Sequence, residues 1–257
     1  MSSPEDLARA VRENPLWYHT LELPGGLVTP GWFDLRPIVD RIPWPDVRGR
    51  RCLDVGTYDG YLAFELEARG AAEVVATDVA SHEDWDWLPR QRSLGPDALA
   101  AMAGPKGRGF ELAAAARGSS VRRELVSAYD LHPDRVGTFD VVVCGSLLLH
   151  LRDPFRALEA IRSVCTGQLV SVEQIEVGLS ALHRRRPTLR LVGEDGQWLV
   201  PNAAAHSAML TTAGFDLLES SRPFAIPMGS AHPDRDRRDR RDLRAWLAER
   251  AVGGRGV

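Results

Sequence analysis

Residues 52–61 read Cys-Leu-Asp-Val-Gly-Thr-Tyr-Asp-Gly-Tyr, an apolar run followed by an acid and a Gly-x-x-x-Gly loop. Glycine permits a sharp turn and a close approach of the backbone to a ligand. A helix that begins after such a loop points unpaired N–H groups at a polar ligand group. Asp54 argues against a phosphate at the strand end and favours a cationic or hydroxylated group there. A second apolar run ends in Asp78, where α/β nucleotide folds place the acid that binds ribose hydroxyls. The stretch therefore predicts a nucleoside site.

Apolar runs and helix-compatible segments alternate outward from this loop. The predicted strands are 51–55, 73–78, 123–127, 139–145, 168–175 and 215–222. The predicted helices are 60–69, 106–117, 154–165, 202–213 and 235–250. This alternation predicts an α/β fold, a doubly wound, mostly parallel sheet with helices on both faces. Ligands of that fold class bind at the carboxyl ends of the strands. Residues 82–105 are predicted to form an irregular excursion over that edge.

Three regions are expected along the chain. Residues 1–46 hold a predicted helix over 3–14 and an aromatic hairpin that forms a lid and acceptor wall. Residues 47–228 form the core, and residues 229–257 carry a charged helix with a solvated face.

Bulk properties exclude several classes of protein. With 257 residues, 44% of them hydrophobic, the chain can bury one large core. The net charge of −3 gives no global attraction to nucleic acid, which is an unlikely partner. Three cysteines without a C-x-x-C pair predict reduced thiols and a cytoplasmic location. We expect no membrane association, no signal peptide and no metal, and the oligomeric state is not predicted.

The glycine loop and Asp78 together resemble the S-adenosylmethionine (SAM) dependent methyltransferases of the Rossmann-like class. The first motif of that class reads acid-x-Gly-x-Gly-x-Gly, and Tyr58 stands here in place of the middle glycine. Residues 17–226 further resemble the branch related to tRNA wobble-uridine methyl/carboxymethyltransferases. The features that carry this resemblance are residues 54–60, Gly145 to His150, and 198–202.

Departures from that branch bear on the donor and the substrate. Leu149 stands where the branch often has tyrosine, and the chain has a single lysine, Lys106. Both features favour ordinary SAM over a carboxylated donor. The longer basic N-terminal part of the tRNA enzymes is also missing, which favours a substrate other than tRNA.

The resemblance implies a set of cofactor contacts. Those to the methionine part of SAM, or of its product S-adenosylhomocysteine (SAH), involve Asp54, Gly56, Thr57, Gly60, Gly145 and Ser146. Those to the ribose and adenine involve Asp78, Val79, Ala128 and Tyr129. Packing is the alternative role for Tyr129.

Catalysis and acceptor binding are predicted from other side chains. His150 follows the fourth core strand, near the expected methyl group, and a helix cap or a pair with Asp153 is its alternative role. Glu173 is a second candidate base at the end of the fifth strand, and His19 is the reserve candidate. The predicted acceptor contacts are Trp17, Tyr18, Trp32 and Glu176. For the aromatic residues a satellite hydrophobic cluster is the alternative, and for Glu176 simple surface exposure.

Together these features predict methyl transfer to a small molecule, an aromatic or heterocyclic natural product of secondary metabolism. The methylated atom (O, N or C) is not predicted. A wobble-uridine-type RNA methyltransferase and a non-catalytic SAM-binding regulator are the alternatives.

Overall fold

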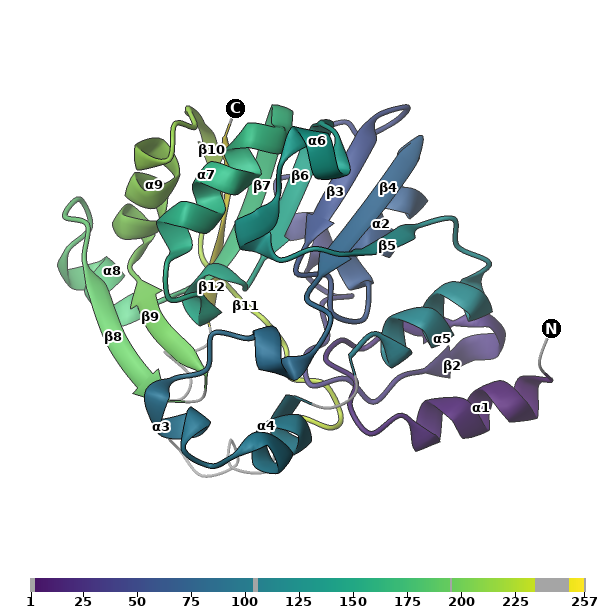
Figure 1. Cartoon of the computed structure of the whole chain (residues 1–257). Coiled ribbons are helices and arrows are strands. Elements are labelled where there is room, and N and C mark those ends of the chain that lie inside the picture. The colour runs from purple at the N-terminus through teal and green to yellow at the C-terminus, as the bar shows by residue number, and fades with distance from the viewer. Residues whose placement is uncertain (1–2, 104–105, 195, 234–249, 257) are drawn as a thin grey trace.

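Five parallel strands form the centre of the fold in the computed structural model, which describes residues 3–103, 106–194, 196–233 and 250–256 (Figure 1). Their order is β7-β6-β3-β4-β5. Their bounds are Arg51–Val55 for β3, Glu73–Asp78 for β4, Arg122–Leu125 for β5, Phe139–Gly145 for β6 and Cys165–Ile175 for β7. The predicted Rossmann-like, doubly wound α/β fold is confirmed, with strand bounds that differ by a few residues.

The sheet continues beyond β7 with a strand that the sequence reading missed. Strand β12 (Arg250–Gly256) pairs antiparallel with β7, and β10 (Leu217–Ser220) and β11 (Phe224–Ala225) pair antiparallel with β12. The expectation of a charged helix throughout 229–257 is therefore wrong for 250–256. The predicted helix over 235–250 otherwise lies outside the described residues.

Alternating side chains of the strands enter two cores, because successive residues of a strand face opposite sides. On one face, Cys52, Val74 and Val141 pack against α2 (Tyr61–Ala68) and α5 (Arg108–Arg117). On the other face, strand residues such as Leu53 pack against three helices. These helices are α6 (Pro133–Val136), α7 (Pro154–Val164) and α9 (Ala203–Thr212). The free cysteines Cys52, Cys144 and Cys165 are all buried.

The N-terminal segment follows its prediction closely. Helix α1 (Pro4–Glu13) starts at a capping box on Ser3, and β1 (Glu22–Leu23) pairs with β2 (Leu27–Val28). Between this hairpin and β3 the chain forms one 3-10 turn, at Val39–Arg41.

Two segments are more regular than predicted. The excursion at 82–105 contains a 3-10 turn at His82–Asp84 and helices α3 (Pro89–Arg92) and α4 (Pro96–Ala103). Helix α8 (Val177–Leu182) follows β7, and a hairpin of β8 (Leu189–Glu194) and β9 (Gln197–Pro201) then stands apart from the main sheet (Figure 1). None of the described helices has both the length and the apolar character that a membrane crossing requires.

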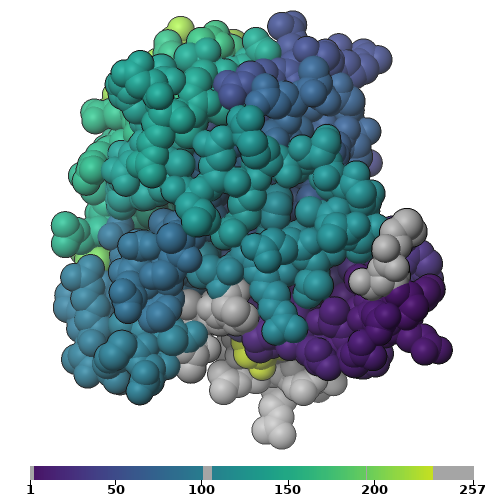
Figure 2. Space-filling model, turned by 45° about the vertical axis from the view of Figure 1, so that its right-hand side comes forward, coloured from purple at the N-terminus to yellow at the C-terminus, as the bar shows by residue number. Residues whose placement is uncertain are grey.

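The strand order reverses between β3 and β6, since the chain proceeds from β3 to β4 and β5 and then returns to β6 and β7. Ligands of open α/β sheets bind outside the carboxyl ends of the strands at such a point. Both views show the N-terminal segment (purple) and the α3–α4 segment (blue) at one end of the molecule (Figures 1 and 2).

Candidate functional site

The glycine loop after β3 is held against β4 by its backbone. The N–H groups of Gly56 and Thr57 donate to the carbonyl of Thr77 at 2.9 and 3.0 Å. Gly56, Tyr58 and Gly60 have φ values of 76°, 51° and 92°, in the region that favours glycine. A Cβ at Gly60 would lie 2.6 Å from the ring of Phe64, so both conformation and space require glycine there.

Two oxygen atoms in this loop are buried without a hydrogen-bond partner among the described residues. They are Asp54 Oδ2 and Thr57 Oγ1. Burial raises the pKa of Asp54 to about 6, and the neighbouring Thr57 side chain and, to a smaller degree, His19 oppose this shift. Unsatisfied buried polar groups are costly, so a polar ligand at the strand end would find acceptors ready for it.

Asp78 ends β4 and accepts four hydrogen bonds. The N–H of Tyr58 donates to Oδ2 at 3.0 Å, and that of Val79 to Oδ1 at 2.8 Å. Lys106 Nζ donates to both oxygens at 3.0 Å. The ammonium also lies 4.7 Å from the centre of the Tyr58 ring and 4.9 Å from that of Trp85. Burial lowers the pKa of Lys106, and the charge on Asp78 opposes that shift.

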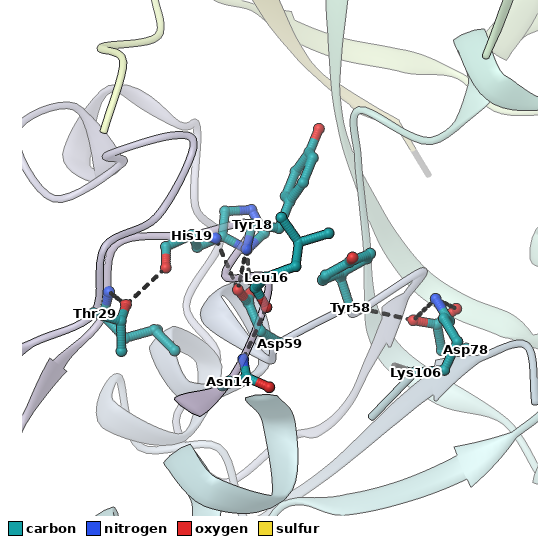
Figure 3. Close-up of polar contacts among 10 residues, drawn as sticks. Asn14, Leu16, Tyr18, His19, Thr29, Tyr58, Asp59, Asp78 and Lys106 are labelled. Carbon is teal, nitrogen blue, oxygen red and sulfur yellow. Dashed lines mark hydrogen bonds and ion pairs between the residues drawn. The ribbon is translucent and has the colours of Figure 1, made fainter. Parts of the chain in front are cut away.

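Asp59, on the other side of Tyr58, joins the loop to the N-terminal segment (Figure 3). The N–H groups of Tyr18 and His19 donate to its Oδ2 at 2.9 and 2.7 Å. The Nδ1 atom of His19 lies 2.5 Å from Oδ1. The carboxylate therefore fixes both the course of this segment and the orientation of the imidazole.

The loop after β6 is tied to β7. Ser146 has a φ of 48°, and its N–H donates to the carbonyl of Val172 at 2.7 Å. Glu173 Oε1 accepts from the N–H groups of Leu147 and Leu148 at 2.9 Å each. Its Oε2 atom has no partner within the described part of the chain, and burial raises the pKa of Glu173 to about 7. The predicted base candidate is thus also the anchor of this loop.

His150 is held by the β8–β9 turn. Its Nδ1 atom lies 2.9 Å from the carbonyl of Gly196, which can only accept, so Nδ1 carries the proton. Burial lowers the pKa of His150. Asp153 caps α7 by accepting from the N–H of Arg156 at 3.1 Å.

Tyr129, a predicted adenine contact, lies in a 3-10 turn at Ala128–Asp130 beside Asp86. Its hydroxyl donates to the carboxylate of Asp86 and accepts from the N–H of Asp153 at 3.1 Å. Trp198 Nε1 donates to the carbonyl of Asp86 at 2.7 Å. The 82–103 segment, β9 and the turn after β5 therefore meet at Asp86.

The predicted acceptor contacts are not brought into one group. The Tyr18 ring lies 6.2 Å from the ring of Trp32 and 5.2 Å from that of Tyr58, next to the loop. Trp17 is 2% exposed and donates through Nε1 to the carbonyl of Val11, in the core. Glu176 accepts from Arg190 Nε at 2.8 Å, at the start of α8.

Sequence reasoning missed Asp59, Lys106 and Asp86 as members of this region. Asp59 lies inside the quoted loop, and an acid between Tyr58 and Gly60 was a visible signal. The single lysine serves in the sequence analysis only as an argument for ordinary SAM, because nothing local links it to Asp78.

A family model described as a methyltransferase domain matches residues 34–220. The chain belongs to the methyltransferase domain family. The matched range contains both loops of the site and all five central strands. No curated protein sequence matches the chain.

Several solved structures share this fold at low sequence identity. The [4+2]-cyclase SpnF has a TM-score of 0.56 and 18% identity, covering 98% of this chain and 92% of its own. The N-terminal domain of EvdMO1, determined with SAH and D-fucose, has a TM-score of 0.56 and 15% identity, covering 100% and 97%. A SAM-dependent methyltransferase from Listeria monocytogenes has a TM-score of 0.50 and 12% identity, covering 86% and 96%. The methyltransferase fold is thus shown, and the resemblance to the wobble-uridine branch stays a prediction.

Proposed function

We propose that the protein transfers the methyl group of SAM to a small-molecule acceptor. The observation that carries this proposal is the glycine loop at the reversal of strand order, with Asp78 at the end of the neighbouring strand. SAM, when bound, supplies a methyl group on a sulfonium centre that a nucleophile can attack in line. Such a reaction depends mainly on positioning, which the rigid loop provides.

The residues present fit SAM at the methionine end. Among the described residues, Asp54 Oδ2 and Thr57 Oγ1 are buried without a hydrogen-bond partner, and both could bind polar groups of the methionine part. The backbone around them belongs to Gly56, Gly60, Gly145 and Ser146. At the nucleoside end, Asp78 would take the ribose, while Val79, Ala128 and Tyr129 would flank the adenine.

One rearrangement is needed for that fit. Asp78 has about four acceptor positions, and four hydrogen bonds from three donor groups fill them. Two of these bonds come from backbone N–H groups, that of Tyr58 in the loop and that of Val79 next to Asp78, so a ribose diol must take the two positions that Lys106 holds. Lys106 is therefore an internal competitor of the nucleoside.

A small-molecule acceptor is supported by two features of the protein and one structural neighbour. The net charge is −3, the aromatic side chains of Tyr18 and Tyr58 lie beside the loop, and the EvdMO1 domain was determined with a sugar. An aromatic or heterocyclic natural product is the acceptor we propose, with Trp32, Trp17 and Glu176 as further candidate contacts. His150, Glu173 and His19 are the candidate bases.

Two experiments test the proposal. Calorimetry with SAM and SAH should give binding, and labelled SAM incubated with a metabolite library should identify an acceptor. Binding of SAM without turnover on any acceptor or on cell extract would favour the alternative of a non-catalytic SAM-binding regulator. The SpnF cyclase shares the fold, and one fold can carry different chemistries.

The RNA-modifying alternative has its own test. Gel-shift with total tRNA should show no tight complex at physiological salt, since the chain is slightly acidic. Submicromolar binding that weakens with salt would replace the small-molecule proposal by the wobble-uridine one.

A further inference from the structure

The contact between His19 and Asp59 defines where the imidazole proton lies. Asp59 is 1% exposed, and its Oδ2 accepts hydrogen bonds from the backbone N–H groups of Tyr18 and His19. A carboxylate only accepts hydrogen bonds, so the Nδ1 atom of His19 at 2.5 Å from Oδ1 must donate. In the neutral ring the proton therefore sits on Nδ1, and Nε2 carries a free lone pair.

The surroundings of His19 leave that lone pair available. Among the described residues no group hydrogen-bonds to Nε2, whereas the backbone of His19 is fully tied. Its carbonyl accepts from Thr29 Oγ1 at 2.9 Å. A Cβ at Gly31 would lie 2.2 Å from the His19 carbonyl carbon, so the segments that contain these two residues pack tightly. The ring stands edge-on to Tyr18, with centroids 4.9 Å apart, beside Tyr61 at 5.5 Å. A fixed backbone and a fixed Nδ1 together aim Nε2 in one direction.

We propose that His19 is the general base and Asp59 its positioning residue, and that the acceptor is protic, a hydroxyl or a ring N–H. This inference rests on the proposed methyl transfer. The acceptor atom forms a bond to the methyl carbon as the carbon–sulfur bond breaks, the sulfonium becomes a neutral thioether, and the acceptor's proton passes to Nε2. The imidazolium then carries the positive charge that the sulfonium has lost.

Two carboxylates face the imidazolium, Asp59 by direct contact and Asp54 through its electrostatic coupling with His19. Within the described part of the chain, the rings of Tyr18 and Tyr61 also lie against the imidazole. His150 has no such support, because its Nδ1 donates to a neutral carbonyl. Of the two histidines, His19 is therefore the one whose Nδ1 donates to a carboxylate.

The tautomer can be read directly by long-range ¹H–¹⁵N spectra of protein carrying ¹⁵N-labelled histidine, with SAH added. His19→Gln assigns the signal. The wild type should show His19 with the proton on Nδ1 at high pH. In Asp59→Asn the amide NH₂ faces Nδ1, so the proton should move to Nε2. Asp134→Asn is the matched control, because Asp134 and His132 form an exposed pair 3.4 Å apart, and His19 should be unaffected.

The wild-type spectrum alone can overturn the proposal, even if Asp59→Asn fails to fold. A wild-type His19 with the proton on Nε2, or a tautomer unchanged in a folded Asp59→Asn, removes the dyad. Calorimetry with SAH on the same samples tests the proposed function separately from the proposed role of His19. Failure of the wild type to bind SAH contradicts the proposed function, whereas SAH binding with the wrong tautomer contradicts only the role of His19.

Discussion

Asp59 and Asp78 lie on the two sides of Tyr58, and their difference shows how a loop can both anchor and bind. Both carboxylates are nearly buried, and both accept from two backbone N–H groups. Asp59 uses its remaining capacity on an imidazole whose own backbone is fixed. Asp78 uses it on the end of a lysine side chain.

The lesson concerns exchangeability. The partner of Asp59 is held at two points, because His19 also donates its backbone N–H to the same carboxylate. The partner of Asp78 can leave by rotation of a flexible four-carbon chain. We therefore expect changes at Asp59 to alter rate and changes at Asp78 to alter affinity.

The largest expected effect is on kcat, and it should distinguish the Asp59–His19 contact from the Asp78–Lys106 contact. With an identified acceptor, His19→Gln and Asp59→Asn should each lower kcat by about 10²–10⁴, because a positioned base is lost. SAM affinity should remain nearly intact, measured by calorimetry. If His150→Gln gives the larger loss and His19→Gln is nearly silent, the assignment is reversed.

The stability of the protein also depends on pH, through a histidine that contacts neither Asp59 nor Asp78. This dependence must be known before the pH dependence of kcat is interpreted. His206 is buried and lies 2.9 Å from Ser171 Oγ, and burial lowers its pKa to about 4. The unfolded chain takes up this proton first, near pH 6.5, so the free energy of unfolding falls as pH decreases from about 6.5 to 4, by about 3 kcal/mol in all.

Asp54 and Glu173 act in the opposite sense. Their pKa values are raised to about 6 and 7, so they stabilise the fold at low pH and lose that contribution as pH rises through those values. Urea unfolding of wild type and His206→Gln between pH 4 and 7 isolates the histidine. An equal acid-side loss of stability in both proteins would contradict its role.

On the binding side, Asp78→Ala should reduce SAM affinity roughly tenfold or more, since a charged acceptor of two hydroxyls contributes about 1.5–3 kcal/mol. The substitution also leaves Lys106 buried without its carboxylate. Asp78→Ala combined with Lys106→Met therefore serves as the control for that free cation. Unchanged affinity in both folded variants would remove Asp78 from the nucleoside site.

The smallest effect should come from removing the competitor. Lys106→Met frees two acceptor positions on Asp78, so SAM should bind more tightly by roughly three- to tenfold, or about 1 kcal/mol. Lys106→Arg keeps the charge and should stay close to wild type. Weaker binding in Lys106→Met would mean that the lysine supports the nucleoside instead of competing with it.

The sequence predicted the central fold because its determinants are local. Apolar runs that end in acids, and glycines at helix ends such as Gly118, mark strands and caps within a few residues. Strand β12 was missed because Val252-Gly253-Gly254 is short of the usual strand formers and is defined by its pairing with β7. The β8–β9 hairpin was missed because Leu189 and Leu191 are exposed, so the strand lacks the alternation of buried and exposed residues that predicts a half-buried strand.

The candidate site was predictable in its loop and not in its partners. The roles of Asp54, Gly56 and Gly60 could be predicted from the spacing of the acid and the two glycines in the sequence. The contacts of Asp59 to His19 and of Lys106 to Asp78 span 40 and 28 residues, and no local pattern encodes which side chains a fold brings together over that separation.

The single lysine has a practical consequence for chemists who wish to label this protein. Because Lys106 is the only ε-amine and its side chain is 6% exposed, an amine-selective reagent meets a protected target in the free protein. Apart from a terminal amine, every conjugate formed reports on one position. Acylation of that position therefore serves as a built-in reporter of whether its carboxylate partner has been taken by something else, without any engineered tag.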